Sequence, residues 1–216
     1  MYQSKHLNIQ ILFQDQDIVV ISKDSGLLSV PGRGEEHYDS VSSRVKDTNS
    51  GCIEQPSVHR LDMDTSGIMV LALKKEAHRN LSIQFQDRKT YKEYEAILEG
   101  IPKEQNGHVE LPFRLDIDNR PHQIYDEAHG KIGITDWEII GVEGTQARVL
   151  FKPLTGRTHQ LRVHAAHEKG IGIPIVGDPL YGNGTGPGQL KLHARLLTFQ
   201  HPRSNESMTF TYQPPW

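Results

Sequence analysis

The sequence predicts an α+β fold with a mixed, largely antiparallel sheet flanked by helices and loops. Strand-like apolar segments outnumber helical ones, and strands alternate with helices too rarely for a parallel α/β architecture. Residues 135–142 and 146–153 are separated by Glu-Gly-Thr, which predicts a hairpin. The 216 residues contain no internal repeat and no clear linker, so we expect a single domain over residues 1–216.

Composition limits the classes of protein that the chain can belong to. Hydrophobic residues make up 36% and charged residues 24%, values typical of a soluble globular protein. No apolar run is long enough to span a membrane, and residues 1–8 are too polar for a signal peptide. The single Cys52 excludes an internal disulfide framework and a cysteine-rich zinc site, so we expect a cytoplasmic protein. The formal net charge of −3 means that RNA binding would require local basic patches.

The first elements are predicted from apolar runs and turn residues. Residues 18–21 form an apolar strand, and Lys-Asp-Ser-Gly at 23–26 forms a turn. The Pro-Gly-Arg-Gly segment around Arg33 predicts a loop, which from these residues alone is a plain turn. Asp39 or Ser40 can cap a short helix that carries Val41 and Val45 on one side.

Residues 59–73 form the segment around which the chain is organised. Its first half, 59–66, is polar and contains Asp62 and Asp64, whereas residues 67–73 form an unbroken apolar run that predicts a buried strand. A polar loop attached to a core strand can hold a reactive group rigidly and leave it open to a substrate. From these residues alone, a plain polar loop before a core strand is the simpler interpretation.

A helix and a strand are predicted next. Ala77, Leu81 and Phe85 recur every four residues within the helix expected over 76–88. Residues 92–100 alternate in the manner of a strand and carry Tyr94. Residues 102–107 predict a loop, and residues 114–123 an irregular exposed segment.

The last third of the chain contains a second polar cluster at 155–164. A helix is predicted to begin near Thr158 and to end at Gly170. Residues 177–182 form a turn-rich loop, and residues 190–200 and 208–212 predict two more strands.

Three kinds of site are compatible with these residues. An ionised Asp62 would need a cation such as Arg162 within about 4–6 Å, which residues a hundred positions apart cannot demonstrate. His159, His164 and His167 could bind a metal, but their spacing matches no strong motif, so structural or surface roles are favoured. A glycosidase pair of Asp62 and Asp64 is less favoured, because such carboxylates usually face each other across a cleft, about 5–9.5 Å apart.

Four short motifs, in their order along the chain, indicate a function more specifically than these three candidate sites do. They are His-Arg-Leu-Asp at 59–62 with Thr-Ser-Gly at 65–67, Lys-x-Tyr-x-Ala at 92–96, Thr-Gly-Arg-Thr-His-Gln-Leu-Arg-Val-His at 155–164, and Gly-Asp-Pro-Leu-Tyr-Gly at 177–182. In combination they resemble the RluA family of pseudouridine synthases, and residues 27–41 and 207–210 are similar to its dual-specificity members. The resemblance covers nearly the whole chain from residue 9. We therefore expect a chain without the N-terminal S4-like RNA-binding domain of some relatives.

The chain departs from the family pattern at two places. The family usually has Lys-Pro where this chain has Lys23 and Asp24, which affects the expected turn geometry. Asp64 lies where the pattern leaves the residue open, so no catalytic role is assigned to it.

The resemblance implies a pseudouridine synthase fold and isomerisation of uridine in RNA, without cofactor or metal. The implied catalytic residues are Asp62, Arg162 and Tyr94: Asp62 would be the catalytic aspartate, Arg162 its ion-pair partner, and Tyr94 would stack on uracil and help to move a proton. Arg60 would enter the RNA stack when the uridine flips out. The resemblance also implies a substrate-binding role for the following residues: His59, Arg60, Arg33, Arg157, His159, Gln160 and Leu192.

The implied substrates are stem-loops of 23S-type ribosomal RNA and the tRNA anticodon arm, bound by a monomer without membrane contact. The alternatives are a single-substrate tRNA pseudouridine synthase and a non-catalytic RNA-binding protein on the same scaffold; a metal hydrolase is the least favoured. RNA binding by an acidic chain would require basic residues gathered on one face. The candidates are Lys74, Lys75, Arg79, Arg88, Lys89, Arg157 and Arg195.

Overall fold

The fold is built on one continuous sheet, as seen in a computed structural model that describes residues 9–216. The strands follow the order β1-β2-β3-β9-β4-β8-β7-β5-β6, and β10 pairs with β9. Within the described residues every strand pair is antiparallel except β3 with β9. The α+β class with a mixed, largely antiparallel sheet is therefore confirmed. Residues 1–8, whose polarity argued against a signal peptide, lie outside the described part.

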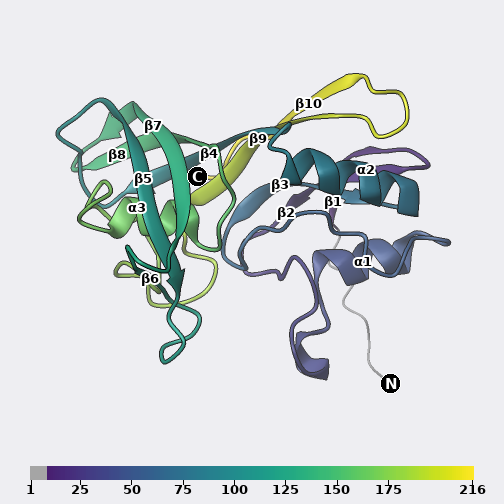
Figure 1. The fold of residues 1–216 in the computed structure, drawn as a ribbon, viewed down its shortest axis with the longest axis horizontal. Coiled ribbons are helices and arrows are strands. Elements are labelled where there is room, and N and C mark those ends of the chain that lie inside the picture. Colours follow the sequence, from purple (N-terminus) through teal and green to yellow (C-terminus); the bar gives the residue numbers. More distant parts are fainter. Residues whose placement is uncertain (1–8) are drawn as a thin grey trace.

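One half of the molecule is a sheet covered on both faces (Figure 1). Every residue of the two strands β2 (Ile18–Lys23) and β3 (Ser66–Ala72) is buried, which explains the unbroken apolar runs at 18–21 and 67–72. Helix α2 (Lys75–Gln86) packs Ala77 and Leu81 on one face, and α1 (Val41–Thr48) packs Val41 and Val45 on the other. Strand β1 (Gln10–Gln14) forms the edge beside β2.

The other half is an antiparallel sheet with one short helix on it. Its strands are β4 (Tyr91–Leu98), β5 (Asn106–Leu115), β6 (Gln123–Tyr125), β7 (Lys131–Glu143) and β8 (Gln146–Pro153), and they lie in the order β4-β8-β7-β5-β6. Its buried face packs against Leu161, Val163 and Ala165 of helix α3 (Gln160–Ala166). The predicted hairpin is β7 and β8, and it turns at Gly144 with a positive φ of 59°.

Strand β9 (Leu192–Gln200) joins the two halves, because it pairs with β3 on one side and with β4 on the other. Strand β10 (Ser207–Thr211) extends from β9 toward the first half. The parallel contact of β3 with β9 is short and spans Ser66 and Gly67. It brings the loop before β3 against the tyrosine-bearing strand β4 and the start of α3.

Several predicted boundaries need correction. The helix expected over 158–170 covers only α3, because His159 has a left-handed φ of 56° and His167 is extended. Strand β5 was missed, and its first residues occupy the end of the loop expected over 102–107. Part of the segment expected to be irregular, 114–123, is the end of β5 and the start of β6. Ser40 does cap α1, in a reciprocal capping box with Ser43.

Candidate active site

The Asp62 loop (residues 59–65) is held from one side by a buried lysine. The Nζ atom of Lys23 donates hydrogen bonds to the carbonyl oxygens of Asp24 at 2.9 Å, Leu27 at 2.7 Å and Met63 at 2.7 Å. Burial lowers the pKa of Lys23 to about 8, while the nearby carboxylates of Asp64, Asp62 and Asp24 act in the opposite direction. All three ammonium hydrogens thus fix backbone around the loop.

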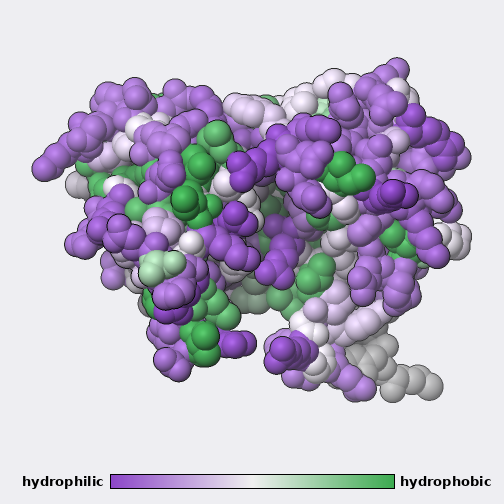
Figure 2. Space-filling model, in the orientation of Figure 1, coloured by the Kyte–Doolittle hydropathy of each residue, from purple (hydrophilic) through white to green (hydrophobic). Residues whose placement is uncertain are grey.

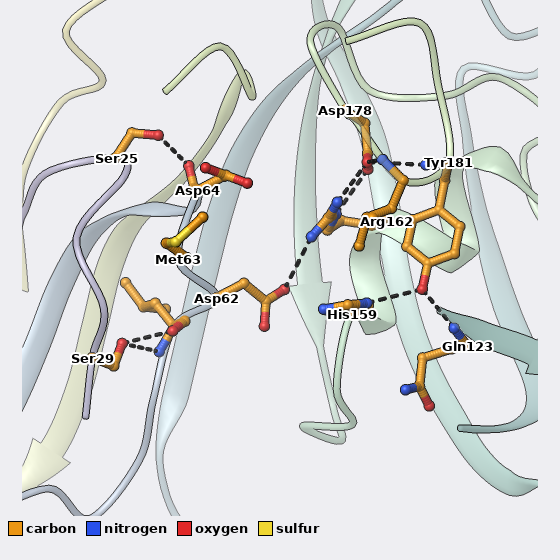
Figure 3. Close-up of polar contacts among 12 residues, drawn as sticks. Ser25, Ser29, Asp62, Met63, Asp64, Gln123, His159, Arg162, Asp178 and Tyr181 are labelled. Carbon is orange, nitrogen blue, oxygen red and sulfur yellow. Dashed lines mark hydrogen bonds and ion pairs between the residues drawn. The ribbon is translucent and has the colours of Figure 1, made fainter. Parts of the chain in front are cut away.

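Two serines hold the same loop on either side of Asp62 (Figure 3). The hydroxyl of Ser29 donates to the carbonyl of Leu61 at 2.6 Å and accepts the Leu61 N–H at 3.1 Å. The hydroxyl of Ser25 donates to the Asp64 carbonyl at 2.5 Å. The backbone before and after Asp62 is therefore fixed, while its side chain points away toward α3.

Arg162, the third residue of α3, meets Asp62 from the opposite side. Its Nη1 lies 3.9 Å from Oδ2 of Asp62, whereas Nε and Nη2 bind the carboxylate of Asp178 at 2.8 and 2.6 Å. Burial alone would raise the pKa of Asp178, but the hydrogen bonds and charge of Arg162 lower it below its usual value. The structure thus brings Asp62 and Arg162 together, and it gives Arg162 a closer partner than the predicted one.

A small pocket of about 100 Å³ opens beside Asp62. Tyr94 and Leu192 come from the adjacent strands β4 and β9, and Arg60 and Arg157 come from the polar loops at 59–65 and 155–160. Burial, followed by the negative charge of Asp62, raises the pKa of Tyr94, so its phenol is protonated at neutral pH. A flat aromatic ring, a carboxylate and four cationic side chains therefore share one pocket: Arg60, Lys92, Arg157 and Arg162.

A larger cleft of about 470 Å³ continues on the other side of Asp62 and Arg162. Its volume is in the range of ligand-binding pockets. Figure 2 shows the surface hollowed between the two halves, with hydrophilic residues around the opening. The cleft wall includes Leu28, Val30, Pro121 and Leu180, so a polar centre is bordered by apolar side chains.

His159 occupies the corner between the pocket and the cleft. It lines both, and its Nδ1 is 2.9 Å from the hydroxyl of Tyr181. That hydroxyl also accepts the N–H of Gln123 at 2.8 Å, and the Tyr181 ring lies 5.3 Å from the guanidinium of Arg162. His159 itself has a left-handed φ of 56°, which is uncommon for a residue with a side chain. This conformation turns the chain sharply into α3.

Three predicted substrate-binding residues have other surroundings. The Val70 N–H donates to Nε2 of His59, whose ring stacks on Phe85 at 4.4 Å, outside the lining of the pocket and cleft. The amide of Gln160 lines the pocket but uses all four hydrogen-bonding positions within the protein. Arg33 is exposed on the loop before η1 (Glu35–His37) and lines neither cavity.

Sequence reasoning missed the roles of Asp178, Tyr181 and Lys23. Asp178 and Tyr181 belong to the Gly-Asp-Pro-Leu-Tyr-Gly motif, which was interpreted as a turn-rich loop and as a family motif, with no role for either residue. Lys23 was interpreted as part of a turn, although it directly follows four apolar strand residues and a serine. A charged residue at the end of a buried strand was the available signal that Lys23 would need partners inside the protein.

The histidines considered as metal ligands do not form a cluster. Within residues 9–216, the group with suitable spacing is instead Asp15, Asp17 and His201. The backbone N–H of Ser204 donates to Nδ1 of His201 at 3.1 Å, so Nε2 carries the proton and donates to Asp15 at 2.8 Å. Because both ring nitrogens are engaged, this group does not present a free imidazole ligand.

Comparison with known proteins places these residues in a family. The model of the family described as "RNA pseudouridylate synthase" matches residues 17–167. The chain belongs to the RNA pseudouridylate synthase family. Members of this family are isomerases that act on RNA, so the non-catalytic alternative and the metal hydrolase are not supported.

Curated relatives and solved structures agree with this assignment. The chain is 46% identical over 204 residues to "Dual-specificity RNA pseudouridine synthase RluA" of Escherichia coli (strain K12), covering 93% of this chain and 90% of that protein. It is 43% identical over 206 residues to the protein of the same name from Haemophilus influenzae, covering 94% and 91%. The solved structure titled "Human RNA Pseudouridylate Synthase Domain Containing 1" matches with a TM-score of 0.77 and 28% identity over 100% of this chain and 87% of that one.

A second human structure supports the fold alone. "Human RNA Pseudouridylate Synthase Domain Containing 4" matches with a TM-score of 0.73 at 24% identity, covering 95% of this chain and 88% of that one. Within residues 9–216 of the chain described here, no helix has the length and hydropathy needed to span a bilayer.

Proposed function

We propose that the chain converts uridine to pseudouridine in stem-loops of large-subunit ribosomal RNA and in the anticodon arm of tRNA. The observation that supports this proposal best is the fixed Asp62 loop, which directs one carboxylate toward Arg162 beside Tyr94. The two substrate classes are suggested by the similarity to proteins named dual-specificity RNA pseudouridine synthase. The narrower alternative is a synthase that acts on tRNA only.

Asp62 is the proposed catalytic residue, acting at or near C1′ or C2′ of the target uridine. The reaction breaks the N1–C1′ bond, turns the uracil and forms a C5–C1′ bond, while the proton on C5 is lost and N1 gains one. It is an isomerisation without net oxidation, so we expect no cofactor. Arg162 keeps a positive charge facing the Asp62 carboxylate throughout.

The uracil ring is proposed to bind in the pocket with the Asp62 loop on one side and with Tyr94 and Leu192 on the other. The raised pKa of Tyr94 favours a protonated phenol, which provides a stacking face and a hydrogen-bond donor. A closed pocket keeps water away from the detached uracil.

The RNA is proposed to reach this pocket by base flipping. A base inside a stack cannot contact Asp62, and unstacking costs a few kcal/mol, least in a loop. Exposed Arg60, which lines both cavities, is placed to fill the vacated stack. Arg157 and Arg33 would contact phosphates on either side, and His159 would face the nucleotide in the cleft.

His59 and Gln160 are proposed to act by supporting the loops that carry Arg60 and Arg157. Their polar atoms bind backbone and side chains of the protein rather than facing the pocket. We also propose one catalytic domain over residues 1–216, a monomer in solution, and a cytoplasmic location with the proposed RNA substrates.

The test is to map new pseudouridines by chemical labelling after the purified protein is mixed with total RNA from a strain lacking it. We expect the wild type to modify ribosomal RNA and tRNA. Asp62→Asn should bind RNA but form no pseudouridine, whereas Asp87→Asn, which changes an exposed carboxylate at the end of α2, should retain activity. New pseudouridines in tRNA alone would support the narrower alternative. RNA binding without any product would overturn the proposal.

A further inference from the structure

Two carboxylates approach the single guanidinium of Arg162, at unequal distances. Asp178 binds Nε and Nη2 through both of its oxygens at 2.8 and 2.6 Å, whereas Asp62 lies 3.9 Å from Nη1 (Figure 3). Arg162 and Asp178 are almost completely buried, while the Asp62 side chain is 25% exposed toward the cavities. The close ion pair is therefore Arg162 with Asp178, and Asp62 remains accessible.

We propose that Asp178 is a positioning residue for the reaction, which holds the Arg162 guanidinium so that Nη1 faces Asp62 without forming a close ion pair with it. This inference rests on the proposed roles of Asp62 and Arg162. Asp178 contacts neither the pocket nor the cleft and would act only through Arg162.

The shape of the guanidinium supports this role. It is a planar group with five N–H donors in fixed directions, so binding the fork of Nε and Nη2 determines where Nη1 points. Asp178 also offsets the buried positive charge. Arg162 therefore has little reason to shift closer to Asp62, whose oxygens stay available to the substrate.

Asp178 is itself held firmly. Its Oδ1 accepts the backbone N–H of Leu180 at 2.9 Å and of Tyr181 at 3.1 Å. The preceding Gly177 has a φ of 75°, and a Cβ at this position would lie 2.1 Å from the carbonyl oxygen of Gln189. The turn that presents Asp178 thus has little freedom to move.

Tyr181 fixes Arg162 from a second direction. Its ring centroid lies 5.3 Å from the guanidinium carbon, and its hydroxyl is bound by His159 and by the N–H of Gln123. The Gly-Asp-Pro-Leu-Tyr-Gly motif therefore supplies both a carboxylate at the edge of the guanidinium and an aromatic ring over its face.

Asp178→Asn tests the inference, because the amide oxygen can still accept the Leu180 and Tyr181 N–H groups while the charge is lost. Arg162 should then move toward Asp62 and mask it. We expect the single-turnover rate on the RNA that the wild type converts fastest to fall about 10- to 100-fold, since small misplacements of reacting groups cost rates of this order. The Kd for that RNA should stay within about twofold, because Asp178 does not line the cavities.

A double-mutant cycle separates positioning from a general structural effect. If Asp178 acts through Arg162, Asp178→Asn should change the rate of the Arg162→Lys variant by less than about threefold. Asp17→Asn is the matched control, because Asp17 is also buried and binds Arg203 at 2.7 Å, far along the chain from the site motifs. It should lower the Tm without lowering the rate.

A wild-type rate for Asp178→Asn, or additive losses in the cycle, would overturn the inference. If Asp178→Asn does not fold, Asp178→Glu takes its place, because it keeps the charge and displaces the carboxylate by one methylene. A lower rate at unchanged Kd supports the inference, and a wild-type rate overturns it. If Asp62→Asn and Arg162→Lys both keep full activity, the proposed function of the site fails instead.

Discussion

At the scale of single residues, some buried polar side chains have hydrogen-bond partners within the described part of the protein and others have none. Lys23 uses all three ammonium hydrogens and Gln160 all four positions of its amide, and both fix loops of the site. His164 is fully buried on α3, and within residues 9–216 neither of its ring nitrogens has a hydrogen-bond partner. An unpaired buried polar group costs stability, so His164 is a residue whose replacement should be informative.

His164→Leu should make folding less sensitive to acid. Burial lowers the pKa of His164 to about 4, against an ordinary value of 6.5. The unfolded state therefore binds more protons than the folded state between these values, and stability is lost as the pH falls from 6.5 toward 4. The difference of 2.5 pH units corresponds to about 3 kcal/mol.

Urea denaturation at pH 7.5 and pH 4.5 measures this effect. At pH 7.5 the variant should be about as stable as the wild type or slightly more stable, and this measurement serves as the control. At pH 4.5 it should be more stable by a further 2–3 kcal/mol or so. An equal difference between the two proteins at both pH values would contradict the prediction.

At the scale of elements, the parallel pairing of β3 with β9 determines where the Asp62 loop lies. Gly67 has a φ of 116°, and a Cβ at this position would lie 2.3 Å from the carbonyl oxygen of Ala194 on β9. A side chain is thus excluded both by the backbone conformation and by the neighbouring strand. The close approach allows Tyr94 on β4 and the Asp62 loop to meet across β9.

Gly67→Ala should destabilise the fold by about 3 kcal/mol, because it adds backbone strain to a steric clash. The free energy of unfolding in urea measures the loss. Gly144→Ala is the matched control: its φ is 59°, but no atom lies within 4 Å of the added Cβ. It should lose only about 1 kcal/mol. Equal losses of unfolding free energy at the two glycines would mean that β3 and β9 are not tightly packed at Gly67.

At the scale of the whole molecule, the site lies where the two halves of the sheet meet, and cations from both halves border it. Arg157 lines the pocket from the second half and Arg60 lines it from the first, while Arg33 is exposed outside both cavities on the loop that leads into α1. Arg195, which was expected in one basic patch with Arg157, instead lies 3.3 Å from Glu95 and 3.8 Å from Glu93. It is therefore less available to phosphate than the sequence suggested.

Arg33→Ala and Arg157→Ala together should weaken RNA binding and reduce the dependence of log K on log salt by about 2, since each arginine is expected to neutralise one phosphate. Filter binding of a stem-loop RNA between low and physiological salt gives the slope. Arg195→Ala is the control and should leave the slope within error of the wild type. A slope unaffected by the double substitution would place the RNA elsewhere.

The sequence by itself determined the family, the α+β class and most of the strands. Unbroken apolar runs such as 18–21 and 67–73 have one favourable environment, the interior of a sheet, so their burial follows from composition. The motifs also predicted that Asp62, Tyr94 and Arg162 belong to one site, and the structure places all three in the lining of the same pocket. Strand β5 was missed because its alternating pattern contains Pro112 and the charged residues Glu110 and Arg114.

Only the tertiary structure decided which partner each site residue has. Asp62 and Arg162 are a hundred positions apart, and their approach depends on β9 pairing with both β3 and β4. Packing between distant segments likewise decides that Arg162 binds Asp178 closely. It also decides that Gln160 and His59 contact other parts of the protein. Local sequence fixes the chemical groups, but distances between groups far apart in the chain are fixed only by the fold.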